Sequence, residues 1–208
     1  MSIAVKVCGM KEPGNIREIA GLPVDMLGFI FHAPSPRYAG SLDPAIAGTL
    51  PGEIRKVGVF VNPARDAALG VARQYGLGAI QLHGEESPDE CRFYRSRGLL
   101  VIKAIPVGEH SPAALATPYA RACDYLLFDT RAPGRGGSGQ QFDWRLLDDY
   151  AGPPPFILSG GIGPEDAGRI RARAHPLLRA VDLNSRFETR PGIKDPRAVQ
   201  QFIQELNN

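Results

Sequence analysis

Short apolar runs recur along the whole chain, separated by segments in which apolar residues have helical spacing. Most of the runs are apolar at every position, which is typical of strands buried on both faces of a parallel sheet. The sequence therefore predicts eight short parallel strands. These cover Ile3–Val7, Met26–Phe31, Lys56–Val61, Ala79–Leu82, Leu99–Ala104, Tyr125–Phe128, Phe156–Leu158 and Ala180–Leu183.

The segments between the runs predict helices. The clearest are Ala64–Tyr75, Pro88–Arg97, Pro164–Arg173 and Pro196–Leu206. A capping residue or glycine before proline is a typical helix start, and the chain has this pattern at Asn62-Pro63, Ser87-Pro88, Gly163-Pro164 and Asp195-Pro196. The helix after the sixth strand is the weakest, because glycines fill much of Gly134 to Gly139.

Strands that alternate with helices indicate a parallel sheet with helices outside it. Eight such units in one chain predict a single (β/α)8 TIM barrel domain over residues 1–208. The main alternative is an open doubly wound sheet, which needs no eighth unit. That fold usually carries Gly-x-Gly-x-x-Gly after its first strand. The sequence here is Gly9-Met10-Lys11-Glu12, which favours the barrel.

Composition narrows the classes of partner. The 208 residues include 24 basic and 22 acidic side chains, a net charge of +2, and no basic run that would indicate nucleic acid or an acidic membrane. Three cysteines fit neither a complete disulfide set nor a zinc motif. No signal peptide or membrane-length apolar run is evident. We expect a soluble, cytoplasmic protein that binds a small molecule, as a monomer or a homodimer.

Reactive side chains follow several predicted strands, where parallel barrels keep their active sites. Cys8 follows the first strand, and Lys6 lies two residues earlier on the same strand face. A nearby ammonium favours the thiolate, which would make Cys8 a better proton acceptor. A lone cysteine is also a common core residue. We interpret Cys91 and Cys123 as structural residues of the core.

Asp129 ends the sixth strand. A carboxylate there is costly unless it is solvated, paired or used, so Asp129 either caps the next loop or works as a general acid. In a ring of eight, strands one and six are three steps apart. Cys8 and Asp129 could therefore face each other across one small substrate, as a base and an acid that act at different atoms.

Other candidates would bind rather than react. Arg37, after Ser35-Pro36, is a surface arginine or a guanidinium fork for a carboxylate or phosphate. Gln81 and His83 alternate along strand four and point the same way, so His83 is structural or orients a substrate hydroxyl. Gly160 and Gly161 follow strand seven, where barrel loops often hold phosphate on backbone N–H groups.

Together these motifs resemble the phosphoribosylanthranilate isomerases over nearly the whole chain. The landmarks are Lys6-Val7-Cys8-Gly9, Gly28–Phe31 with Ser35–Tyr38, Lys56–Asn62, Gln81–Gly84, Asp129 with Gly136–Gly139 and Phe142–Trp144, Ser159–Gly161, and Pro191–Asp195. The resemblance implies an Amadori rearrangement in tryptophan biosynthesis. N-(5-phosphoribosyl)anthranilate would become 1-(2-carboxyphenylamino)-1-deoxyribulose 5-phosphate.

The resemblance also implies roles for single residues. Asp129 would be the general acid that opens the sugar ring, and Cys8 the general base that removes the C2 proton. Arg37 would hold the anthranilate carboxylate, and the loops after strands seven and eight would hold the phosphate. No metal or organic cofactor is implied, because the iminium intermediate is itself the electron sink.

One segment departs from the family pattern. Where many relatives have Ser-Ser-Gly-Val-Glu after strand eight, this chain has Asn184-Ser185-Arg186-Phe187-Glu188. Arg186 replaces a glycine beside the expected phosphate. It would strain the backbone if the position requires positive φ, contact the phosphate directly, or point into solvent. Our hypothesis is that Asn184, Ser185 and Arg186 still form a working site.

Two alternatives stay open. The histidine-pathway sugar isomerase runs the same chemistry on a related barrel, but it uses an aspartate on strand one, where this chain has Cys8. A barrel retained only to bind a partner protein is the non-catalytic alternative. The presence of both Cys8 and Asp129 argues against it.

Overall fold

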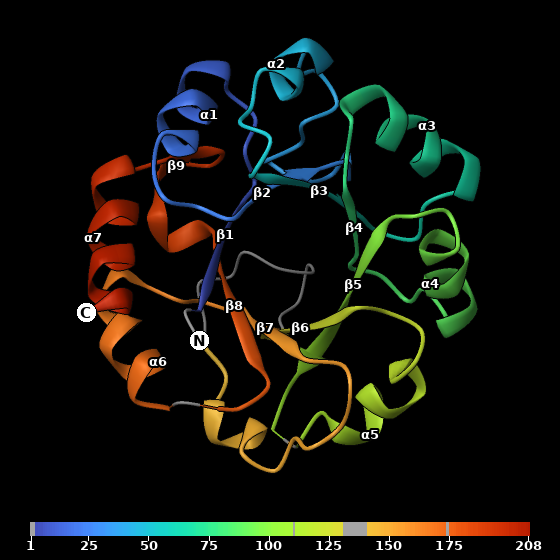
Figure 1. Ribbon diagram of the computed structural model, residues 1–208, viewed down its shortest axis with the longest axis vertical. Helices are drawn as coiled ribbons and strands as arrows, with labels where there is room; N and C mark the ends of the chain where they lie inside the picture. Colours follow the sequence, from blue (N-terminus) through green and yellow to red (C-terminus); the bar gives the residue numbers. More distant parts are fainter. Residues whose placement is uncertain (1–2, 110, 131–140, 174) are drawn as a thin grey trace.

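Eight parallel strands close into a barrel in the computed structural model, which describes residues 3–109, 111–130, 141–173 and 175–208. Figure 1 looks along the barrel and shows the strands in chain order around the ring, with the helices outside. The predicted (β/α)8 barrel is confirmed. Its strands are β1 (Ala4–Cys8), β2 (Met26–Ile30), β3 (Arg55–Phe60), β4 (Ala79–Leu82), β5 (Leu100–Val107), β6 (Tyr125–Thr130), β7 (Phe156–Leu158) and β8 (Leu178–Leu183).

Helices follow most of the strands, among them the four for which the sequence predicted residue ranges. They are α1 (Pro13–Ala20), α2 (Pro44–Gly48), α3 (Arg65–Tyr75), α4 (Pro88–Arg95), α5 (Ala113–Ala116), α6 (Ala167–Arg173) and α7 (Pro196–Asn207). The expected helix Pro164–Arg173 begins with a 3-10 turn, Pro164–Asp166, before α6. Between β6 and β7, the described residues form only a 3-10 turn at Trp144–Leu147. The helix expected after the sixth strand is therefore missing from the described part of this segment. None of the described helices combines the length and apolar character of a membrane span.

The barrel has two apolar layers that follow the alternation of each strand. Outward-facing residues such as Val7 and Phe128 belong to the large core between strands and helices. Inward-facing residues such as Ala79, Leu127 and Ile157 form a second, smaller cluster inside the barrel. Because side chains alternate along a strand, the same inward faces continue toward the carboxyl ends of the strands. There they become polar.

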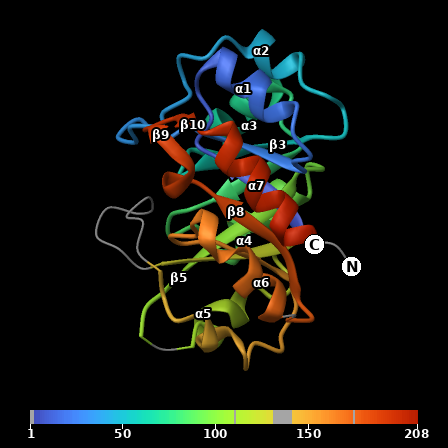
Figure 2. The same ribbon diagram turned by 90° about the vertical axis from the view of Figure 1, so that its left-hand side faces the viewer.

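A short hairpin follows β8 and has no counterpart in the sequence prediction. Its strands are β9 (Glu188–Arg190) and β10 (Ile193–Lys194), which pair antiparallel. Figure 2 shows this hairpin on the side of the barrel away from the C-terminus. Phe187, just before the hairpin, packs on Phe202 of α7, with ring centroids 5.3 Å apart. The hairpin thus sits against the helical layer, beside the carboxyl ends of the strands.

Candidate active site

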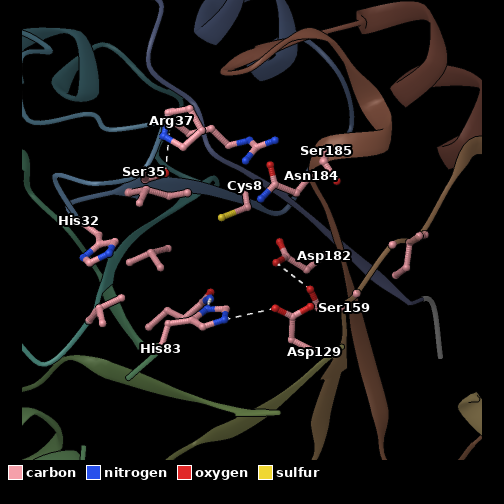
Figure 3. A pocket seen from close by; sticks show the side chains of 18 of the residues that line it. Cys8, His32, Ser35, Arg37, His83, Asp129, Ser159, Asp182, Asn184 and Ser185 are labelled. Carbon is pink, nitrogen blue, oxygen red and sulfur yellow. Dashed lines mark hydrogen bonds and ion pairs between the residues drawn. The ribbon is translucent and has the colours of Figure 1, made fainter. Parts of the chain in front are cut away.

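A cavity of about 160 Å³ opens at the carboxyl ends of the strands. Figure 3 shows its side chains converging from several strands and from the loop after β2. The cavity brings together every site residue predicted from the sequence except Arg186. Its lining includes Cys8, Arg37, Gln81, His83, Asp129, Gly160, Gly161, Asn184 and Ser185.

Cys8 lies on one wall of this cavity, beside a buried ion pair. Lys6 Nζ donates to Asp182 Oδ1 at 2.8 Å, and neither side chain is more than 5% exposed. Gly28 on β2 leaves room for this group, since a Cβ there would lie 2.8 Å from Cys8 Sγ and 3.2 Å from Lys6 Nζ. Burial is the largest single influence and works to lower the pKa of Lys6, but the charges of Asp182 and Cys8 and the hydrogen bonds to them together outweigh it, so the pKa of Lys6 is raised.

The charges around Cys8 give a different balance from the one predicted. Burial raises the pKa of the Cys8 thiol, and the nearby charge of Lys6 only partly offsets this effect, while Asp182 adds to it. Lys6 does favour the thiolate, as predicted. The total effect of all surrounding groups is nevertheless to raise the pKa of Cys8, so the prediction that Cys8 would be a better proton acceptor is wrong. The cause is desolvation, which disfavours a charged thiolate inside the barrel.

Asp129 faces the cavity from β6 and is held by His83, which directly follows β4 and is itself contacted by Gln81 of β4. His83 Nε2 lies 3.2 Å from Asp129 Oδ2, and Gln81 Nε2 lies 2.9 Å from His83 Nδ1. An amide nitrogen only donates, so His83 Nδ1 accepts and its proton lies on Nε2, directed at Asp129. The other amide atom of Gln81, Oε1, is buried without a partner among the described residues.

The glycine turn after β7 is built for close approach to its neighbours. Gly160 has φ +86° and Gly161 φ +65°, and a Cβ on Gly160 would lie 2.3 Å from Thr130 Oγ1. Turns with such residues can present backbone N–H groups to an anion. Gly161 is also tied by its carbonyl, which accepts from Gln141 Nε2 at 2.9 Å. The glycine-rich residues 134–139 singled out in the sequence lie outside the described part of the chain.

Arg186 lies next to this turn but not in the cavity. It belongs to a 3-10 turn, Ser185–Phe187, and the positive-φ residues of the described chain do not include it, so the backbone strain that a positive φ would bring is not present. Its Nη2 donates to Glu165 Oε1 at 2.5 Å, and its side chain is 39% exposed. Its guanidinium carbon would lie 2.8 Å from a Cβ on Gly163. Arg186 therefore packs over the loop after β7 and leaves the cavity open.

Sequence reasoning missed several polar groups at the site. Ser159 and Asp182 line the cavity, with Ser159 Oγ 3.4 Å from Asp182 Oδ2. Glu188 binds Arg37 through both of its carboxylate oxygens. Asp182 carried a usable signal, because it interrupts the apolar run Ala180–Leu183 on the same strand face as Asn184. Within the described residues, no group of three or more His, Cys, Asp or Glu is placed to hold a metal ion.

A closed parallel barrel with a polar cavity at its strand ends is the architecture of (β/α)8-barrel enzymes. The sequence matches the N-(5'-phosphoribosyl)anthranilate (PRA) isomerase family over residues 5–205. The chain belongs to this family.

Individual relatives agree with the family match. N-(5'-phosphoribosyl)anthranilate isomerase from Parabacteroides distasonis is 44% identical over 204 residues, which cover 97% of this chain and 92% of the relative. The crystal structure of phosphoribosyl anthranilate isomerase from Thermotoga maritima has a TM-score of 0.84 at 35% identity and covers 99% of this chain and 98% of that one. Another isomerase structure, a complex with reduced 1-(o-carboxyphenylamino)-1-deoxyribulose 5-phosphate, has a TM-score of 0.84 at 32% identity, with the same coverage.

Proposed function

We propose that this protein catalyses the isomerisation of N-(5'-phosphoribosyl)anthranilate to 1-(2-carboxyphenylamino)-1-deoxyribulose 5-phosphate, a step of tryptophan biosynthesis in the cytoplasm. Membership of the isomerase family supports the reaction. The observation that carries the proposal is the cavity itself, because Cys8 and Asp129 line it from different strands of the barrel. An acid and a base can then act on two atoms of one substrate.

Asp129 is the general acid in this proposal. Its carboxyl proton passes to the furanose ring oxygen, the bond from C1 to that oxygen breaks, and the nitrogen lone pair forms the C1 iminium. Asp129 is left as a carboxylate, which His83 stabilises through a hydrogen bond from its Nε2–H. A positioned acid or base typically contributes about 10²- to 10⁴-fold to the rate.

Cys8 is the general base of the second step. Its thiolate takes the C2 proton, the C–H electron pair forms the C1=C2 double bond, and the iminium electrons return to nitrogen. The enolamine then loses its hydroxyl proton, C1 takes up a proton, and the ketone forms. The cationic iminium next to Cys8 offsets the burial that raises the pKa of the thiol. Substrate and product are isomers, so no redox partner enters the balance.

The remaining residues hold the two anionic ends of the substrate. Gly160, Gly161 and Ser185 line one side of the cavity and would receive the phosphate on backbone N–H groups and a hydroxyl. Arg37 would bind the anthranilate carboxylate, and Gln81 and His83 would contact the sugar. Arg186 supports the phosphate loop from outside the cavity through Glu165.

Genetic complementation tests the proposal in a cell. A bacterial strain that lacks its own PRA isomerase needs tryptophan for growth, and we expect this gene to restore growth without it. A Cys8→Ala variant expressed at the same level is the matched control and should not restore growth. Failure of the unchanged gene, with folded protein present in the cells, would contradict the proposed function.

A further inference from the structure

Arg37 enters the cavity already bound to an acidic side chain. Its Nε lies 2.9 Å from Glu188 Oε1, and its Nη2 lies 2.8 Å from Glu188 Oε2. This side-on pair uses one edge of the guanidinium and leaves Nη1 for another partner. Glu188 has little freedom to move, because Gly192 N also donates to its Oε1 at 3.0 Å. Arg37 is thus presented to the cavity in a fixed orientation.

Lys194 is the third charge of the cluster. Its backbone is clamped by Asn15 of α1, which accepts from Lys194 N at 2.7 Å and donates to Lys194 O at 2.8 Å. Its side chain is fully buried, and Nζ donates to Glu188 Oε1 at 2.6 Å and to Asn184 Oδ1 at 2.8 Å. Asn184 itself lines the cavity. Burial lowers the pKa of Lys194, while the charge of Glu188 and the hydrogen bond to it oppose this effect and favour the ammonium. The Lys194 side chain is therefore held beside the carboxylate that holds Arg37.

The charge of the cluster decides what it can bind. Arg37 and Glu188 alone would form a neutral pair, and the carboxylate of Glu188 would repel an incoming carboxylate. Adding Lys194 gives two cations around one anion, a net charge of +1. Burial works to raise the pKa of Glu188, but the hydrogen bonds from Arg37 and the charge of Lys194 outweigh it and hold that pKa below its usual value. Glu188 is thus an anion within the cluster.

We propose that Glu188 and Lys194 are positioning residues that fix Arg37 as a receptor for a substrate carboxylate, with Lys194 supplying the charge that leaves the cluster at +1. The inference depends on the proposed function, since the carboxylate is that of the anthranilate ring. An arginine that is preoriented and not neutralised binds a carboxylate well, because a charge-assisted pair is strong where water is excluded.

A purely structural role for the three charges explains less. The hairpin that carries Glu188 and Lys194 is already anchored by Phe187 on Phe202 and by the backbone clamp from Asn15. Neither anchor needs a charged side chain at position 188 or 194. The charges instead converge on Arg37 and Asn184, both of which line the cavity. The positions of these charges are therefore explained by the cavity and not by the stability of the hairpin.

Two probes separate the roles. One is the reduced product analogue, 1-(2-carboxyphenylamino)-1-deoxyribulose 5-phosphate with its ketone reduced, and the other is the same compound without the ring carboxylate. We expect Lys194→Met to raise the Kd for the probe that carries the carboxylate by about tenfold or more, and tenfold is equivalent to about 1.4 kcal/mol of binding free energy. The Kd for the probe without the carboxylate should change by no more than about twofold. Lys56→Met, which removes a lysine at the opposite end of the barrel, is the matched control and should change neither.

A double variant makes the test sharper. Glu188→Gln combined with Lys194→Met restores the net charge of +1 on Arg37, so it should bind the carboxylate probe more tightly than Lys194→Met alone. If Lys194→Met does not fold, the double variant should still prefer the carboxylate probe. Equal weakening of both probes by Lys194→Met would overturn the inference, as would a double variant without that preference. If the unchanged protein binds neither probe, the proposed function fails and the inference fails with it.

Discussion

The thiol of Cys8 lies among opposing charges, and their sum decides how readily it ionises. Lys6 and Lys194 lower its pKa, Asp182 raises it, and burial raises it most. Asp182 therefore has two effects. It compensates the charge of the buried Lys6, which donates to it at 2.8 Å, and it thereby weakens the stabilisation that this ammonium gives to the thiolate. In the proposed mechanism, Cys8 keeps its proton until positive charge develops on the substrate, which then favours the thiolate.

Titration of Cys8 tests this balance. Because its pKa is raised, the thiolate should form only above about pH 8.5, the ordinary thiol value. Asp182→Asn removes a negative charge, so the midpoint should move to lower pH. The measurement is thiolate absorbance near 240 nm against pH, with a Cys8→Ala protein subtracted to remove Cys91, Cys123 and the tyrosines. A midpoint below the ordinary value in the unchanged protein would contradict the assigned electrostatics.

Arg186 gives a second prediction for a single residue. Since its guanidinium pairs with Glu165 on the surface and does not line the cavity, replacing Arg186 with the glycine expected from the resemblance should have little effect. Arg186→Gly should leave KM within about twofold and cost about 0–1 kcal/mol of stability, as exposed ion pairs usually do. Steady-state kinetics and thermal unfolding measure both. A rise in KM of tenfold or more would show that Arg186 contacts the phosphate after all.

The sequence revealed single residues better than pairs of residues. Cys8, Asp129 and His83 could be placed at the cavity because each directly follows an apolar run. Their partners could not be inferred from spacing. Lys6 and Asp182 are separated by 176 positions, and Arg37 and Glu188 by 151. Only closure of the barrel brings them together, so the charge balance at Cys8 and Arg37 needed the structure.

At the scale of elements, caps and apolar runs were sufficient for most of the fold. Ser87 caps α4 with a capping box, and Asp195 caps α7 through Arg197 N and Ala198 N, as the Ser-Pro and Asp-Pro pairs indicate. The prediction was weaker where local signals compete. Pro63 does not begin α3, which starts at Arg65 after Ala64. The β9–β10 hairpin is short and polar, so it has no apolar periodicity to reveal it.

The helix α7 fixes this hairpin, and its buried face can be tested. Phe202 is 1% exposed and stacks edge-on against Phe187. Phe202→Ala should cost about 3–5 kcal/mol, because it removes a large core side chain and leaves a cavity. The exposed neighbour variant Gln201→Ala should change the free energy of unfolding by no more than about 0.5 kcal/mol. Denaturant unfolding measures both. Equal small effects would place Phe202 outside the core.

On the scale of the whole molecule, the barrel separates stability from chemistry. Apolar side chains such as Val57, Ala79 and Ile157 fill the barrel interior below the site. Polar side chains on the same inward faces form the cavity above it. Closure places Cys8 and Asp129 on strands that are not neighbours, and Arg37, Gly160 and Gly161 line the same cavity. The arrangement suits one small substrate with a carboxylate at one end and a phosphate at the other.

The most direct test is turnover of N-(5'-phosphoribosyl)anthranilate by the purified protein, followed through the loss of its anthranilate fluorescence. We expect rapid loss with the unchanged protein. Asp129→Asn should be slower by about 10²- to 10⁴-fold, the usual contribution of a general acid. Asp66→Asn, the same change on the exposed face of α3, is the control and should be unaffected. No turnover by the folded, unchanged protein, or full turnover by Asp129→Asn, would contradict the assignment of this cavity as an isomerase site.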